Sequence, residues 1–287
     1  KPFPGVTSPQ VPTWRDRMLR LVATLAFVNC LALPAAWAAT VTADGVVLIS
    51  HADALAGNVT PGDTAGYPIT ITRSGTYRLK SNLAPTASKS GFFVQANEVT
   101  LDLNGFAMTG SATAVDGVSG AEIVAFKNLT VMNGTIRNFG QDGVLFAGPG
   151  LRVENMRVIA NRRYGINELY LNASPKTGKE DGHAIIRNNV IMSNFQGITC
   201  QSGCHIEGNV ISHNQASAII ISQSGATVIN NTISNNGGYG VVGNYVGLGG
   251  NTIFGNGYCH TSGVMMVMGR NAIYPQTGTF CVALPGN

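Results

Sequence analysis

A short motif, an asparagine followed two positions later by an isoleucine, recurs five times in the C-terminal half of this 287-residue chain. Successive copies are 20, 22, 20 and 20 residues apart, and a second asparagine follows most of the isoleucines by three positions. A fixed period of about 20 residues is typical of solenoids, in which each repeat buries its apolar side only by stacking on its neighbours. The isoleucines are Ile191, Ile211, Ile233, Ile253 and Ile273, and the asparagine columns are Asn189, Asn209, Asn231, Asn251, Asn271 and Asn161, Asn194, Asn214, Asn236, Asn256.

The segments between these columns favour β-strands. They are short, alternating and rich in β-branched residues, as in residues 218–221 and 226–230, and such spacing leaves no room for helices of about ten residues. Gly143, Gly165 and Gly197 each precede a strand, and we expect them to supply the positive φ of the corners. Asparagine amides both donate and accept, so copies stacked ~4.8 Å apart are expected to hydrogen-bond along each column. Because crossovers between parallel strands are right-handed, the sequence predicts an all-β, right-handed parallel β-helix.

The chain resembles the bacterial exported right-handed parallel β-helix repeat proteins, relatives in fold of the pectate-lyase-like superfamily. The resemblance rests on residues 99–110, on residues 128–136 and on the asparagine-isoleucine repeats, and it covers roughly two-thirds of the chain. It implies work on glycans for many members, although lyases, hydrolases, epimerases and non-catalytic surface proteins share this scaffold. The resemblance is therefore more specific for fold than for function.

The pattern divides the chain into three expected parts. Residues 1–39 form a leader with a signal peptide, residues 40–90 form an N-terminal cap, and residues 91–287 form the β-helix. Within the cap, residues 50–57 favour a short helix begun by a serine. Residues 67–79 favour a hairpin, because two alternating segments flank a glycine-bearing turn.

The leader carries an apolar run at residues 21–33 that ends near the small residues Ala36 and Ala38, as in a cleavable signal peptide. An uncleaved anchor is the alternative, but the run contains Asn29 and ends in small residues. We expect an exported product, secreted, periplasmic or at the cell surface, with no membrane span after cleavage. Removing residues 1–39 leaves 18 − 4 = 14 basic and 14 − 1 = 13 acidic residues. A net charge of 14 − 13 = +1 does not indicate a nucleic-acid-binding surface.

Export permits disulfides among the cysteines that remain. Cys200 and Cys204 are predicted to close a small corner loop, and Cys259 and Cys281 are one repeat apart, which suits a bond between adjacent coils. A metal site that combines cysteines with His205 or His260 is less favoured, because no metal-binding spacing supports it. No cofactor is expected, and no sequence motif supports calcium.

Charged residues gather in one region of the predicted β-helix. Eleven of them lie in residues 152–187, where residues 167–183 also break the period as an insertion, and insertions on a solenoid often carry binding groups. The sharper hypothesis is that this region binds an acidic sugar, and the alternative is a solvated loop of surface ion pairs. Asp116 and Asp142 precede corner glycines and are interpreted as turn residues. The substrate-binding candidates are Arg162, Arg163, Tyr164, Tyr170, Lys176 and Lys179, and the acid and base candidates are Glu180, Asp181 and His183.

The sequence thus favours an exported β-helix that binds an acidic or cell-surface polysaccharide. Processing of that polysaccharide by lyase, hydrolase or epimerase chemistry is left open. The alternative is a non-catalytic surface or adhesion scaffold, and a periplasmic metal-delivery helper of the same fold is a weaker third hypothesis. Nothing in the pattern indicates the oligomeric state.

Overall fold

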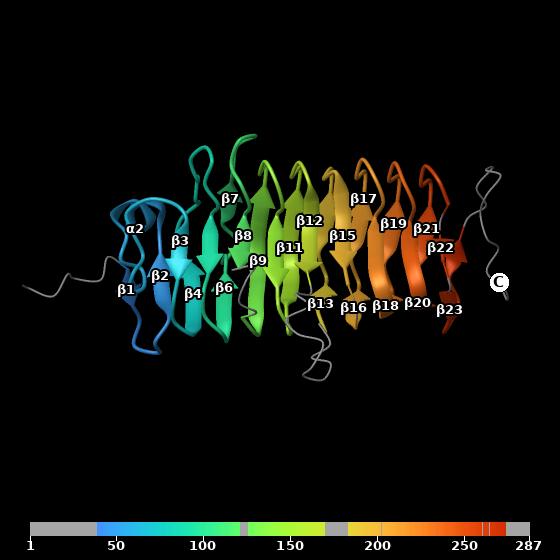
Figure 1. The fold of residues 1–287 in the computed structure, drawn as a ribbon, viewed down its shortest axis with the longest axis horizontal. Coiled ribbons are helices and arrows are strands. Elements are labelled where there is room, and N and C mark those ends of the chain that lie inside the picture. Colours follow the sequence, from blue (N-terminus) through green and yellow to red (C-terminus); the bar gives the residue numbers. More distant parts are fainter. Residues whose placement is uncertain are drawn as a thin grey trace, which may run out of the picture. The chain divides into compact units, whose positions relative to one another are not determined.

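The computed structural model describes residues 39–120, 126–169, 183–201, 203–259, 261–263 and 265–273. These residues lie in one compact unit, Ala38–Asn287. Among the described strands, β2 to β24 stack in parallel and the pair β1–β2 is antiparallel. The strands fall on three faces, which successive coils cross in the same order (Figure 1). Within the described ranges, no helix has the length and apolar composition of a membrane-spanning segment.

The A face is the longest of the three. Its strands pair in the order β2, β4, β6, β9, β11, β13, β16, β18, β20 and β23. The N-terminal halves of β9 and β11 and the C-terminal parts of β18 and β20 belong to it. The bounds are β2 Val47–Ile49, β4 Gly75–Leu79, β6 Val99–Asp102, β9 Leu129–Arg137, β11 Arg152–Ile159, β13 Ile185–Arg187, β16 Cys204–Glu207, β18 Ile219–Ile229, β20 Val241–Gly249 and β23 Met265–Val267.

The B face carries the repeated isoleucines, and the C face follows it in each coil. The B face combines β7, the second halves of β9 and β11, and then β14, β17, β19, β21 and β24. The C face pairs β3, β5, β8, β10, β12, β15, the first parts of β18 and β20, and β22. The bounds are β7 Ala107–Thr109, β14 Val190–Met192, β17 Val210–Ser212, β19 Thr232–Ser234, β21 Thr252–Phe254, β24 Ala272–Ile273, β3 Ile69–Ile71, β5 Phe92–Val94, β8 Val118–Gly120, β10 Val144–Ala147, β12 Tyr164–Leu169, β15 Gln196–Cys200 and β22 Thr261–Ser262.

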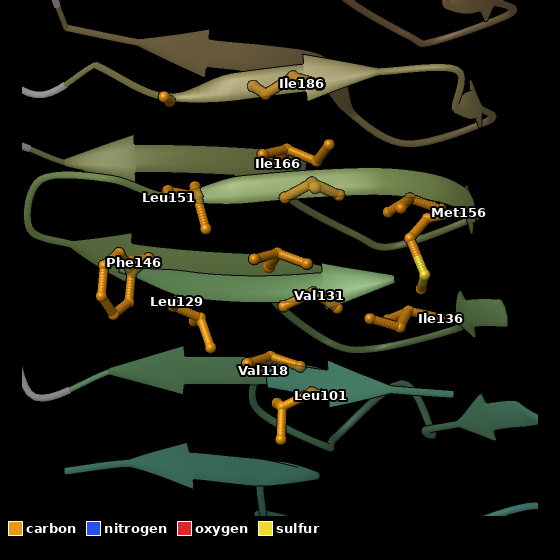
Figure 2. Packing of buried hydrophobic residues seen from close by; sticks show 14 of the residues in the cluster. Leu101, Val118, Leu129, Val131, Ile136, Phe146, Leu151, Met156, Ile166 and Ile186 are labelled. Carbon is orange, nitrogen blue, oxygen red and sulfur yellow. The ribbon is translucent and has the colours of Figure 1, made fainter. Parts of the chain in front are cut away.

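The repeated isoleucines form the predicted interior column. Ile191, Ile211, Ile233 and Ile253 occupy the same register position on successive strands and are fully buried. On the A face, equivalent apolar side chains also stack coil upon coil (Figure 2). Each fully buried side chain of this size contributes ~1.5–3 kcal/mol relative to exposure. The parallel β-helix predicted from the period is therefore confirmed.

Both asparagine columns form hydrogen-bonded ladders, as predicted. The side-chain amide of each asparagine donates to the side-chain oxygen of the next at 2.9–3.2 Å. The same oxygen also accepts a backbone N–H from the coil before it, as Asn209 does from Asn189 at 3.0 Å. The positive φ of each corner falls one residue earlier, at Asn188, Gly208 and Asn230 in the first column. The ladder side chains therefore satisfy the corners without adopting the left-handed conformation themselves.

The role predicted for the strand-opening glycines was wrong. Gly143, Gly165 and Gly197 do not have positive φ. Instead, a Cβ atom on Gly143 would lie 2.6 Å from the carbonyl oxygen of Gly165, and one on Gly197 would lie 2.4 Å from that of Ala218. These glycines are required because adjacent coils approach each other closely at this corner.

The N-terminal end is closed by a hairpin and a short helix. Strands β1 (Thr40–Val41) and β2 form the hairpin, and α2 (His51–Ala56) begins with a capping box in which Ser50 and Asp53 satisfy each other's backbone N–H groups. The hairpin predicted at residues 67–79 was wrong. Its two segments, β3 and β4, pair instead with β5 and with β2 and β6, so they are successive faces of one coil.

Candidate functional site

Polar side chains are buried on both sides of β12, at the end of which the insertion begins. The side chain of Ile166 lies in the interior column, in register with Val144 and Ile198. Side chains alternate along a strand, so Asn167 points outward and Glu168 points inward. Asn167 is 1% exposed and Glu168 is 0% exposed, which is unusual for these residue types.

On the outward side, Asp142 connects three coils. Its Oδ1 accepts the backbone N–H of Tyr164 at 3.1 Å, and its Oδ2 accepts the side-chain amide of Asn167 at 2.9 Å. The backbone N–H of Asp142 donates in turn to Oδ1 of Asp116 at 3.0 Å. Both aspartates are buried. Sequence reasoning treated them as turn residues and missed that they bridge the coils of the C face.

An arginine lies beside this carboxylate, and a second arginine precedes it in the sequence. The Nε atom of Arg163 is 3.9 Å from Oδ1 of Asp142, and its guanidinium carbon lies 4.9 Å from the centre of the Tyr164 ring. The side chain of Arg163 is 50% exposed, and Arg162 is also exposed. Asn167 contacts the same carboxylate through its amide, and its Oδ1 is buried and has no hydrogen-bond partner. The C face therefore carries an accessible cation and an unsatisfied acceptor beside one carboxylate.

On the inward side, Glu168 occupies the interior column between Phe146 and Cys200. Its Oε2 accepts the backbone N–H of Gln201 at 2.9 Å and lies 3.5 Å from Sγ of Cys200. Its Oε1 is buried and has no hydrogen-bond partner. Burial raises the pKa of Glu168 to about 7, and the Gln201 N–H offsets part of that effect. An inward carboxyl with an unsatisfied oxygen is costly in a β-helix interior.

The predicted disulfide between Cys200 and Cys204 is present, with Cα atoms 6.6 Å apart. Cys259 is also disulfide-bonded, and Cys281 lies outside the described residues. The disulfide and Glu168 form a buried cluster, because a sulfur from each cysteine and a Glu168 carboxylate oxygen all lie within 4.8 Å of one another. Sequence reasoning did not single out Glu168. Glu168 follows Gly165 by three residues, and Cys200 follows Gly197 by three residues. Aligning these two glycines in the sequence would therefore have placed Glu168 next to Cys200.

The structure separates two groups of predicted site residues. Arg162, Arg163 and Tyr164 lie where the B face turns into the C face, whereas His183 precedes β13 at the corner from the C face to the A face. These corners are separated by the length of β12, about 17 Å at ~3.3 Å per residue. His183 is exposed and lines a hollow of 280 Å³ on the A face together with Arg152. Tyr170, Lys176, Lys179, Glu180 and Asp181 lie outside the described residues.

Stacked parallel coils with internal asparagine ladders define this chain as a parallel β-helix repeat protein. Residues 105–281 match the family model described as "Periplasmic copper-binding protein (NosD)". This match spans more than half of the chain, so the protein belongs to the NosD family. The family is periplasmic, which agrees with the predicted export.

Two other comparisons complete this picture. A solved structure, the A-module of a mannuronan C-5 epimerase from Azotobacter vinelandii, is similar to the chain, with 16% sequence identity and a TM-score of 0.43. The alignment covers 84% of this chain and 89% of that one. No curated protein sequence matches the chain.

The family description raises the question of where copper would fit. Copper in its reduced state prefers sulfur ligands, and imidazole also suits copper. Among the described residues, the His, Cys, Asp and Glu side chains converge in a group of three or more at Glu168, Cys200 and Cys204. Their donor set suits copper only when the sulfurs are thiolates, because the thiolate is the metal ligand.

Proposed function

We propose that the protein binds an acidic polysaccharide on the outer C face, with Arg162 and Arg163 holding sugar carboxylates. The observation that carries this proposal is the half-exposed guanidinium of Arg163, held by Asp142 and by the ring of Tyr164. A fixed guanidinium binds a carboxylate through two parallel N–H donors at little entropic cost. Tyr164 then acts as a support for Arg163, in addition to the substrate-binding role predicted for it.

Asn167 supports the same proposal. Its buried Oδ1 lacks a donor, and an unsatisfied buried acceptor costs ~1–3 kcal/mol. A sugar hydroxyl that reaches this oxygen would remove the cost, which favours a ligand that carries hydroxyls as well as carboxylates. The binding roles of Tyr170, Lys176 and Lys179, and the acid and base roles of Glu180, Asp181 and His183, stay predictions. The proposal therefore concerns binding, and any processing step is left to those residues.

Replacing Arg163 with alanine is expected to weaken binding of a polyuronate oligosaccharide about 10-fold or more, because a charge-assisted hydrogen bond contributes ~1.5–3 kcal/mol. Isothermal titration calorimetry measures the effect. Arg137→Ala is the matched control, since Arg137 is an exposed arginine on the B face and its loss should leave affinity unchanged. Equal affinity of Arg163→Ala and the unsubstituted protein would refute this site.

A second function is favoured by a separate observation. We propose that the protein also binds copper, as the NosD family description states for that family. The supporting observation is the buried group of two sulfurs and one carboxylate in the described part of the chain. Anaerobic titration of the full chain with copper(I), in competition with a chromogenic chelator and in the presence of a reductant, is expected to show about one tightly held ion per chain. Failure to withdraw any copper from the chelator would contradict this function.

A further inference from the structure

We propose that Cys200 and Cys204, once reduced, bind a copper(I) ion with Glu168 as third donor, so that their disulfide works as a redox switch for metal binding. This inference rests on the proposed copper function and goes beyond it by naming the ligands and the condition under which they bind. It does not depend on the polysaccharide proposal.

The cluster brings the three donor residues together. One donor atom from each lies within 4.8 Å of the other two while the sulfurs are joined as a disulfide. After reduction the sulfurs must separate to at most about 4.6 Å to bind one metal at ~2.3 Å each. The Cα atoms, 6.6 Å apart, are held close enough for this. Cys200 ends β15 and Cys204 begins β16, so both cysteines are held by strands that pair with β18 in the next coil.

Glu168 supplies the observation that points to a ligand. Its side chain is fully buried, one carboxylate oxygen lies 3.5 Å from Sγ of Cys200, and the other has no hydrogen-bond partner. The interior column that contains it is otherwise apolar on both sides of the cluster, with Phe146 before it and Ile221 after Cys200. A metal ion between the carboxylate and the sulfurs would give the unpaired carboxylate oxygen a partner in the buried interior.

The redox state decides whether the site exists. In the disulfide the two sulfurs carry no negative charge, and thiolates are the ligands that copper(I) selects. Reduction by a dithiol breaks the Cys200–Cys204 bond, transfers two electrons and two protons to the sulfurs, and converts the dithiol into its own disulfide. Binding of copper(I) then displaces the two thiol protons to solvent. Reoxidation by a disulfide reverses the exchange and releases the ion.

The reducing partner has a short route to the cluster. Cys200 and Cys204 are separated by a three-residue corner, in which Gln201 and Gly203 are half-buried. The disulfide thus lies at the corner between the C face and the A face, next to half-buried residues.

The test compares the oxidised and reduced forms of the full chain. Each form is prepared without free reductant, its thiols are counted with a thiol-reactive dye, and copper(I) is titrated anaerobically against a chelator while the ultraviolet copper-thiolate absorption is followed. We expect about one copper(I) per chain with that absorption in the reduced form and none in the oxidised form. The oxidised form serves as the control for the reduced form, because the two have the same sequence.

Three variants locate the ion. Cys200→Ser with Cys204→Ser keeps the Cys259 disulfide and is expected to lose the copper-thiolate absorption, and Glu168→Gln is expected to weaken binding about 10-fold or more. Met266→Leu with Met268→Leu, which removes one exposed thioether on β23 and one just after it, is the matched control and should bind as the unsubstituted protein does.

The outcomes separate the two proposals. Equal copper binding by the oxidised form and by the double serine variant would overturn the redox switch while leaving the copper function in place at another site. Absence of copper binding in both redox forms would overturn the copper function and the switch together.

Discussion

Replacing Asn209 with alanine is expected to lower the free energy of unfolding by about 3 kcal/mol, because the side chain connects three coils. Its Oδ1 accepts both the backbone N–H and the side-chain amide of Asn189, and its own amide donates to Ile186 and Asn231. Alanine leaves the buried N–H of Asn189 and the buried carbonyl of Ile186 without these partners. Urea denaturation followed by far-ultraviolet circular dichroism measures the loss.

The ladder offers its own control. Asn271 accepts from Asn251 but has no further ladder partner among the described residues, and it is 9% exposed. Asn271→Ala should therefore cost about half as much as Asn209→Ala, because it breaks the ladder on one side only and lies nearer the surface, although its amide also donates to the carbonyls of Leu248 and Gly269. If Asn209→Ala and Asn271→Ala lowered the free energy of unfolding equally, the hydrogen bonds between the asparagine side chains would not be what stabilises the coils.

The interior carboxyl predicts a second large effect, on the pH dependence of stability. Burial raises the pKa of Glu168 from 4.5 to about 7, so the folded protein binds this proton more tightly than the unfolded chain does. Stability from this group is therefore complete below pH ~4.5, falls as the pH rises through about 7, and is constant above that. The total change is ~3 kcal/mol, at 1.36 kcal/mol per pKa unit.

Glu168→Gln isolates this effect, because glutamine has nearly the same shape and does not titrate in this range. With the disulfide intact and no metal added, the stability difference between the variant and the unsubstituted protein should grow in favour of the variant from pH 5 to pH 8. Glu207→Gln is the control, because Glu207 is a partly exposed glutamate on the A face. A difference that stays constant with pH for Glu168→Gln would show that this carboxyl titrates as an ordinary surface group.

The fold was predictable because its contacts repeat at the same interval as its sequence. Ile211 contacts Ile191 and Ile233, one period away in each direction, so the sequence period itself predicts which residues are in contact. The asparagine ladders were predictable for the same reason, because identical side chains stack and one amide can hydrogen-bond to the next. The misplaced hairpin shows the limit of this reasoning. Residues 67–79 alternate as a hairpin would, and only pairing with β2, β5 and β6 decides that they belong to a coil.

The candidate site was predictable only in part, because it lies where the period breaks. Arg163 and Tyr164 were identified from charge and aromatic content, whereas Asn167 and Glu168 were counted as the start of the insertion. The structure shows that β12 continues through Leu169, so these two residues still alternate between the outside and the interior. Burial of a carboxyl depends on which side of the strand it takes, and that cannot be assigned until the register across the insertion is known.

The ladders also give the stack a direction. In both columns, each asparagine that is followed by another directs its NH₂ group toward the following coil and its oxygen toward the preceding one. Aligned amides polarise one another, and their dipoles add as peptide dipoles do along an α-helix. The C-terminal end of the columns thus carries partial positive charge, and a negatively charged group is favoured at that end over the opposite one.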